Sequence, residues 1–207
     1  MIKKVLFIIL VMGLTCPAWS TIVTPTVENY GFEDAGTELV SWEEVPGWSS
    51  DIIALNSGVK ADTTATEGSF TAYLFNGDPS VYNLTDYITQ LDNEYVLELD
   101  ARNDSTGSDP AMLEISLFLD VYGDRVTVIS KTVELTDSWT TFSLDYYSDT
   151  LPAVYNKIGI ELANVTPSGQ SSISVDNVRF VPEPATIALL GFGSIVLLNT
   201  RKNKFSK

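Results

Sequence analysis

The strongest constraint on the fold of this chain is an alternation of apolar and polar residues with a period of two. Hydrophobic side chains recur at every second position through residues 95–102, 113–121 and 140–146. Successive side chains of a strand point to opposite faces, so this pattern predicts strands that bury one face and leave the other wet. No helix longer than one or two turns is expected in this part of the chain. The pattern therefore predicts an all-β fold in which two antiparallel sheets pack face to face as a β-sandwich.

Turns and breaks in the alternation add detail to this prediction. A Gly-Asp pair at residues 123–124 lies between two strand-like stretches and predicts a two-residue hairpin turn. The apolar positions change parity between Val27 and Phe32, and again between Val175 and Val178. A parity change of this kind marks a β-bulge, in which one extra residue re-aims the side chains that follow. We therefore predict a bulge in the first strand and another in the last.

Residues 1–20 have the features of a secretory signal peptide. Two lysines open the chain, an apolar stretch of residues 5–14 follows, and small residues stand at positions 18 and 20. This order predicts an N-terminal signal helix that directs export of the protein. Signal peptidase is expected to remove it by cleavage after Ser20. Cys16 is the one cysteine of the chain, so the mature protein cannot form a disulfide.

Residues 181–207 form a second processing segment. It opens with Val181, Pro182, Glu183 and Pro184, continues with an uncharged apolar run of residues 185–198, and ends in a basic cluster that includes Arg201, Lys202 and Lys204. The two prolines fix φ and remove backbone donors, so the folded domain should end here. As a helix, the apolar run would cover roughly 21 Å, less than the ~30 Å of a bilayer's hydrocarbon core. The basic cluster predicts that the C-terminus stays in the cytoplasm.

A Pro-Glu-Pro motif, a short hydrophobic helix and a basic end, in this order, resemble the PEP-CTERM sorting signal. The resemblance implies processing near Pro182 to Pro184 by exosortase, a membrane-embedded transpeptidase of Gram-negative bacteria. Until then the C-terminal helix would hold the protein transiently in the inner membrane. Its destination would be the cell surface or an extracellular matrix rich in polysaccharide. An ordinary tail anchor that happens to follow two prolines is the alternative.

The single domain between these segments, residues 21–180, resembles galactose-binding-like jelly rolls, which include many carbohydrate-binding modules. The resemblance rests on Val-Glu-Asn-Tyr-Gly-Phe-Glu at 27–33, Pro-Gly-Trp at 46–48, Tyr-Val-Leu-Glu-Leu-Asp-Ala-Arg at 95–102 and Val-Asp-Asn-Val-Arg-Phe at 175–180. It implies a jelly-roll sandwich whose first and last strands are neighbours. It also implies that a structural calcium joins a glutamate on the first strand to an aspartate on the last, here Glu33 and Asp176.

The domain is strongly acidic, with six basic residues against 26 acidic ones and a net charge of −20 over residues 21–180. Such a surface repels nucleic acid and anionic lipid, and it attracts divalent cations. Nucleic-acid binding is therefore excluded as a function. The same charge also keeps an exported protein soluble.

The residue types narrow the chemistry further. The chain has no histidine and the mature chain has no cysteine, which excludes nucleophilic systems that need either residue and also histidine-zinc sites. A polysaccharide-active enzyme could still use a pair of carboxylates as its catalytic groups, but no pair stands out among so many acidic residues. We therefore predict an exported, non-catalytic surface or matrix protein. A polysaccharide-active enzyme is the weakest alternative.

Glycan binding is the second hypothesis. Sugar sites stack a pyranose ring on an exposed aromatic side chain and surround it with polar groups. The ring candidates are Trp42, Tyr73, Tyr82 and Tyr87, followed by Tyr122 and Tyr155, with Asn76, Asp78 and Asn83 as polar neighbours in sequence. The alternative is that most of these rings fill the interior of the sandwich.

Overall fold

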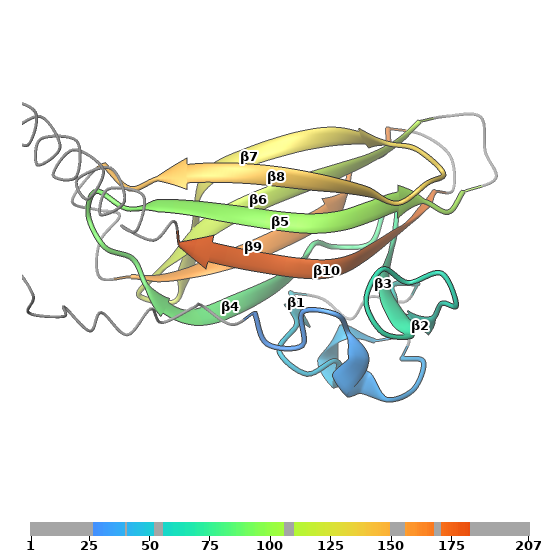
Figure 1. Cartoon of the computed structure of the whole chain (residues 1–207). Coiled ribbons are helices and arrows are strands. Elements are labelled where there is room, and N and C mark those ends of the chain that lie inside the picture. The colour runs from blue at the N-terminus through green and yellow to red at the C-terminus, as the bar shows by residue number, and fades with distance from the viewer. Residues whose placement is uncertain are drawn as a thin grey trace, which may run out of the picture.

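The computed structural model describes residues 27–39, 41–51, 56–105, 110–149, 156–167 and 171–182, with backbone alone for the last two. Ten strands form two five-stranded antiparallel sheets that pack face to face (Figure 1), which confirms the predicted β-sandwich. The strand order is β1-β4-β9-β6-β7 in one, here named the β6 sheet, and β2-β3-β10-β5-β8 in the other, named the β10 sheet.

The strands of the β6 sheet are Ser49–Ser50 (β1), Val81–Ile88 (β4), Lys157–Asn164 (β9), Ala111–Val121 (β6) and Asp124–Leu135 (β7). Those of the β10 sheet are Gly58–Ala61 (β2), Phe70–Phe75 (β3), Ser172–Pro182 (β10), Glu94–Asn103 (β5) and Thr140–Tyr147 (β8). Two short 3-10 helices, Glu33–Ala35 (η1) and Trp42–Glu44 (η2), precede β1.

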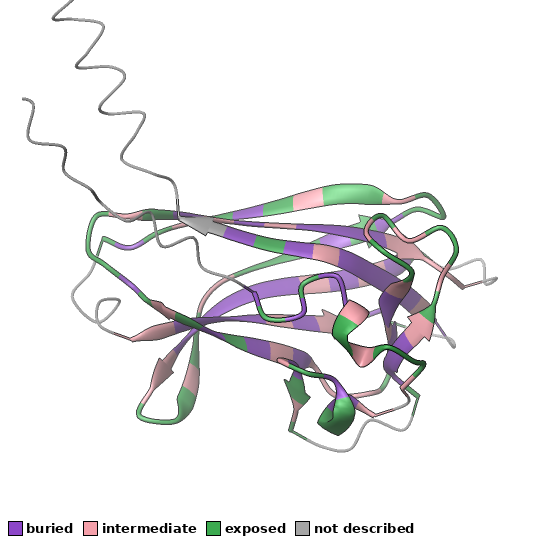
Figure 2. Cartoon of the chain, turned by 60° about the horizontal axis from the view of Figure 1, so that its bottom comes forward, coloured by how far each residue is buried: buried purple, intermediate pink, exposed green. Residues whose placement is uncertain are grey.

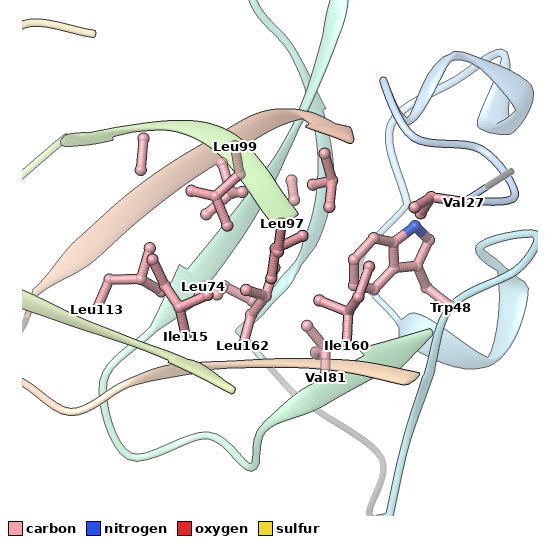
Figure 3. Packing of buried hydrophobic residues seen from close by; sticks show 14 of the residues in the cluster. Val27, Trp48, Leu74, Val81, Leu97, Leu99, Leu113, Ile115, Ile160 and Leu162 are labelled. Atoms are coloured by element: carbon pink, nitrogen blue, oxygen red, sulfur yellow. The ribbon is translucent and has the colours of Figure 1, made fainter. Parts of the chain in front are cut away.

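The core lies between the two sheets and is built from the alternating apolar positions. Leu97 and Leu99 of β5 point across the sandwich toward Leu113 and Ile115 of β6 (Figure 3), and all four side chains are at most 1% exposed. Burying one such side chain stabilises the fold by about 1.5–3 kcal/mol. Buried residues gather along the strands and exposed ones in the connecting loops (Figure 2). The alternation in the sequence therefore arises because one face of a strand is buried, as predicted.

The β6–β7 hairpin turns one residue earlier than predicted. Val121 pairs with Asp124, so the two loop residues are Tyr122 and Gly123 rather than Gly123 and Asp124. Both have positive φ, 56° and 94°, which is the backbone that favoured two-residue hairpin turns require. The carboxylate of Asp120 accepts a hydrogen bond from the Gly123 amide at 2.8 Å and supports the turn.

One predicted bulge is present and the other is replaced by a turn. The register of β10 on β5 shifts between Asp176 and Arg179, as the parity change in the last strand predicted. The segment before η1 is a turn instead of a first strand. Asn29 there has a φ of 53°, and its side chain donates to the Pro46 carbonyl and accepts from the Asp34 amide. These local hydrogen bonds favour a turn over a strand.

The predicted terminal segments lie almost wholly outside the described residues, and these segments include residues 1–20, Glu183, Pro184, Arg201, Lys202 and Lys204. β10 continues two residues past the predicted end of the domain, because Val181 and Pro182 still pair with Val96 and Tyr95. Within the described ranges, we find no helix with the length and apolar character needed to cross a membrane.

Candidate functional site

The outer face of the β6 sheet carries a group of aromatic and charged side chains from all parts of that sheet. Tyr82 comes from β4, Phe118 from β6, Arg125 from β7 and Glu161 from β9, while Asp51 directly follows β1. These five residues are named the Tyr82 cluster. The four strand residues meet on one face because each stands at a position that alternates with the core positions of its strand, and Asp51 joins them from the end of β1.

Arg125 is the centre of this cluster. Its guanidinium carbon lies 3.9 Å from the centroid of the Tyr82 ring and 5.8 Å from that of Phe118. The two rings meet edge to face, with centroids 6.2 Å apart and planes at 82°. A planar cation held on a ring in this way is attracted by the ring's negative face, by about 0.5–2 kcal/mol.

Two carboxylates complete the cluster. Both terminal nitrogens of Arg125 donate to the carboxylate of Asp51, one of them at 2.8 Å, and the Arg125 Nε lies 3.9 Å from Glu161 Oε2. β7 and β1 are the two opposite edges of the sheet, and strands are spaced about 4.8 Å apart. The contact of Arg125 with Asp51 therefore crosses the outer face of the whole sheet.

Gly159 makes room for the buried ring of Phe118 on this outer face. Phe118 is only 1% exposed, although it stands on the face that points away from the core. A Cβ placed on Gly159 would lie 2.1 Å from the Cζ of Phe118, so the ring rests directly on the β9 backbone. This close approach holds Phe118 flat against the sheet and fixes the edge that it presents to Tyr82.

The charges of the cluster favour ligands that donate hydrogen bonds. The hydrogen bonds from Arg125 hold the pKa of the Asp51 carboxyl below its ordinary value, because they favour its charged form, and they raise the pKa of Arg125. The hydroxyl of Ser80 donates to Glu161 Oε1. One cation with two carboxylates therefore offers flat surfaces for stacking, acceptors for hydroxyl or N–H groups and little attraction for an anion.

The four leading aromatic candidates do not come together. Tyr82 belongs to the cluster, whereas Trp42 is 1% exposed and packs against Phe32 and Trp48, so its ring offers no face to a ligand. Tyr73 lies on the outer face of the other sheet, where the Lys60 ammonium is 6.0 Å from its ring centroid. The ring of Tyr87 is half-buried and packs edge to face on that of Tyr95 at 5.7 Å.

The remaining candidates lie elsewhere. Tyr122 is fully exposed at the β6–β7 turn, and Tyr155 is outside the described residues. The side-chain amide of Asn83 donates to the Glu28 carbonyl and that of Asn76 to the Thr166 carbonyl, so both serve local structure. Asp78 accepts hydrogen bonds from Ser57 and Asn56 and likewise fixes a loop.

The two predicted calcium ligands hold the loop between β2 and β3. Glu33 Oε1 accepts hydrogen bonds from the amides of Ser69 and Phe70, both at 2.7 Å. Asp176 Oδ2 accepts from the amides of Thr66 and Glu67 at 2.7 and 2.8 Å. Asp176 thus holds the middle of the loop and Glu33 holds its end, where β3 begins.

This arrangement does not fit a cation. Calcium needs six to eight oxygen ligands, whereas Asp176 Oδ2 faces N–H and O–H donors and its Oδ1 accepts from the Asn177 amide. Among the described residues, His, Cys, Asp and Glu side chains form no group of three that could hold a metal ion. Asp176 is fully buried, and this burial raises the pKa of its carboxyl. The hydrogen bonds that it accepts act in the opposite direction, because they favour the charged carboxylate, but they offset the effect of burial only in part. Calcium at Glu33 and Asp176 stays a prediction, and it requires the loop to rearrange.

Four members of the Tyr82 cluster are absent from the sequence-based candidates. Phe118 did give a signal, because it is an aromatic residue at a position where its strand otherwise carries polar side chains. Asp51, Arg125 and Glu161 gave none. Charged residues are the ordinary content of a wet strand face, and nothing in the alternation pairs residues as distant as 51 and 125.

Fold and site together define a β-sandwich with an aromatic and charged cluster on the outer face of one sheet. A family model described as HpiC1-like, HpiC1 cyclase, matches residues 23–181, and the chain belongs to this family. A second model, the PEP-CTERM protein-sorting motif, matches residues 180–202 and confirms the predicted sorting signal. No curated protein matches the chain.

Solved structures share the fold. A cyclase from Fischerella sp. TAU is 19% identical, covers 78% of this chain and 98% of its own, and gives a TM-score of 0.61. The same organism's Fisc, a Stig cyclase solved with (3Z)-3-(1-methyl-2-pyrrolidinylidene)-3H-indole, has the same identity and coverage and a TM-score of 0.60. The CBM22-1-GH10 modules of Clostridium thermocellum xylanase 10B, solved with xylohexaose, are 15% identical over 77% of this chain and 28% of theirs, with a TM-score of 0.50.

The prediction of a non-catalytic protein is wrong, because the family to which the chain belongs is one of cyclases. The prediction rested on the lack of histidine and of cysteine in the mature chain, which excludes particular nucleophiles and metal sites. Ring closure needs neither residue. Holding a substrate in its folded conformation, together with proton transfer at a carboxylate, can lower the barrier.

Proposed function

We propose that this protein is exported, held in the inner membrane by its tail until exosortase releases it, and then binds a ring-shaped ligand at the Tyr82 cluster. The ligand class that fits best is a neutral glycan of the extracellular matrix. The sorting-motif match supports the route. The observation that carries the ligand is the Arg125 guanidinium 3.9 Å from the centroid of the Tyr82 ring, with the carboxylates of Asp51 and Glu161 beside it.

The cluster matches the chemistry of a sugar ring. A pyranose presents C–H groups on its faces and hydroxyls around its rim, so it stacks on a flat surface and donates to acceptors beside it. Tyr82 supplies the aromatic surface, held from below by the buried ring of Phe118, and Asp51 and Glu161 supply the acceptors. The acidic surface of the domain disfavours negatively charged polysaccharides, which restricts the choice to neutral ones.

Retention of the secreted domain on neutral polysaccharides tests this proposal. We expect dissociation constants of about 10⁻³ to 10⁻⁵ M, because small polar ligands gain little free energy per atom. Tyr82→Ala should weaken binding about tenfold, which corresponds to ~1.4 kcal/mol. Tyr73→Ala is the matched control, since Tyr73 is also half-buried but lies on the other sheet. Equal losses in the two variants, or no retention by the wild type, would remove the glycan from this account.

Family membership favours a second candidate function at the same cluster, the cyclisation of a substrate. The indole ligand in the structure of Fisc indicates that such a substrate can carry an aromatic ring system. An indole could stack against Tyr82 and donate its N–H to a carboxylate. The test incubates an indole-bearing substrate with the wild type or with Glu161→Gln. Chromatography then measures its conversion to an isomer of equal mass. Conversion that is lost in Glu161→Gln supports the cyclase. Absence of conversion by the wild type, or equal conversion by Glu161→Gln, would contradict cyclisation of such substrates at this cluster.

A further inference from the structure

One end of the sandwich carries most of the exposed apolar side chains of the described residues. This end, named the Pro182 end, is where β4, β8 and β10 finish and β5 begins (Figure 1), and the pairs Tyr95–Pro182 and Glu94–Tyr147 mark it. Among the eight large hydrophobic side chains of the described residues that are exposed, five lie at or near this end: Ile88, Leu91, Tyr122, Val126 and Tyr147. The other three are Tyr30, Leu84 and Val165.

The sorting tail leaves from the same end and has no linker. The sorting-motif match begins at Phe180, inside β10, and β10 is paired as far as Pro182. The apolar run begins at residue 185, three residues later. Three extended residues span at most about 10 Å. The headgroup layer on each side of a bilayer is roughly 5–8 Å thick. An inserted tail therefore draws the Pro182 end against the headgroups.

The end of β10 is firmly held within the fold. Phe180 is 2% exposed, and its ring stacks parallel on Tyr95 with centroids 5.7 Å apart and planes at 1°. Tyr95 is itself fully buried, and its hydroxyl accepts a hydrogen bond from the Gln90 amide at 2.8 Å. Lengthening the tail by peeling β10 from β5 would expose these rings, so the domain cannot easily move away from the membrane.

We propose that the Pro182 end is a membrane-contacting surface that rests in the interfacial layer of a zwitterionic bilayer while the tail is inserted. This inference relies on the proposed anchoring by the tail. Tyrosine rings such as those of Tyr122 and Tyr147 are favoured at the headgroup level, and aliphatic side chains such as Leu91 gain from leaving water. The acids Asp92, Glu94 and Asp149 also lie exposed at this end, so anionic lipids are repelled and zwitterionic ones are preferred.

Tryptophan quenching by brominated lipid measures this contact in the full chain. The chain, with its signal peptide removed and its tail intact, is reconstituted into vesicles of zwitterionic phospholipid with bromines near the headgroup end of the acyl chains. Leu91→Trp places a probe at the Pro182 end. Val165→Trp is the matched control, because Val165 is also an exposed aliphatic residue and follows β9 at the opposite end. Flotation of both variants with the vesicles reports anchoring independently.

The expected result is strong loss of the added fluorescence in Leu91→Trp and little loss in Val165→Trp, with both proteins floating. Anionic vesicles should reduce the quenching of Leu91→Trp. Equal quenching of the two probes on floating protein overturns the contact but leaves anchoring intact. Quenching that appears only when exosortase is present identifies a protein partner and also overturns the proposal. Failure of both variants to float overturns the anchoring and the contact together.

Discussion

Replacing Gly159 with alanine tests whether Phe118 positions the Tyr82 cluster. A Cβ at residue 159 would lie 2.1 Å from Cζ of Phe118 and 2.6 Å from both of its Cε atoms. Carbon atoms in ordinary contact are about 3.5–4.0 Å apart, so the ring must move by more than about 1 Å. Because Phe118 is buried and meets Tyr82 edge to face, its movement displaces Tyr82 and the guanidinium that lies on it.

Two terms of opposite sign set the size of the effect. Overpacking a well-filled site costs about 1–3 kcal/mol. Glycine inside a strand is about 0.5–1 kcal/mol less favourable than alanine, which offsets part of that cost. We expect Gly159→Ala to lower the free energy of unfolding by about 1–2 kcal/mol, and the melting temperature by about 2–4 °C for each kcal/mol. Urea unfolding and thermal melting of the secreted domain measure both quantities.

A Phe118→Leu background separates the ring contact from other causes. Leucine lacks the atoms that the new Cβ would meet, so Gly159→Ala should cost less than about 0.5 kcal/mol there, and the two changes should be non-additive. Ligand affinity should fall in Gly159→Ala and should not fall further in the double variant. If Gly159→Ala costs the same in both backgrounds, the strain does not lie in the contact with Phe118, and the reasoning is refuted.

Three further predictions concern the tail, calcium and pH. Replacing Arg201, Lys202 and Lys204 with glutamate should impair processing, since the positive-inside bias orients a marginal span; normal surface delivery of the variant would contradict this. If calcium binds at Asp176, a hundredfold excess over its dissociation constant should raise the melting temperature by about 5 °C or more above that in equal magnesium. Equal melting curves would remove the site. Because the pKa of Asp51 is lowered, its charge persists as pH falls through the ordinary carboxyl range and is lost only below it, so ligand affinity should stay level from about pH 7 to about pH 4. A midpoint well above pH 4 would show that another group controls binding.

The architecture follows from local rules and was therefore open to prediction from the sequence. A period of two is imposed on each strand separately, so residues 113–121 reveal a half-buried strand without knowledge of its neighbours. The bulge in β10 was visible for the same reason. The segment from Val27 to Phe32 was misread because the side chain of Asn29 bonds Pro46 and Asp34, and such bonds leave no trace in the apolar pattern.

The candidate site depends on relations between strands and was mostly hidden. The contact of Arg125 with Asp51 joins β7 to the residue after β1, and these strands lie at opposite edges of the sheet. Nothing in the local sequence around either residue indicates this pairing. Two local signals were present, the aromatic Phe118 on a polar face and the small Gly159 beside it on β9. Together they indicate that the Phe118 ring rests on the backbone of Gly159. That these two residues are partners, however, follows only from the pairing of β6 with β9 in the fold.

The pKa of Asp51 narrows the roles that the cluster can have. A fold alone does not decide between a sugar-binding domain and a cyclase, since a single architecture hosts many functions and the site must discriminate. A general acid works best with a raised pKa that keeps its proton at neutral pH. Asp51 has the opposite shift, because Arg125 stabilises its charge, so Asp51 is suited to accept hydrogen bonds and not to donate a proton. If the cluster closes rings, Glu161 is the carboxylate left to move the proton, and Glu161→Gln separates catalysis from binding.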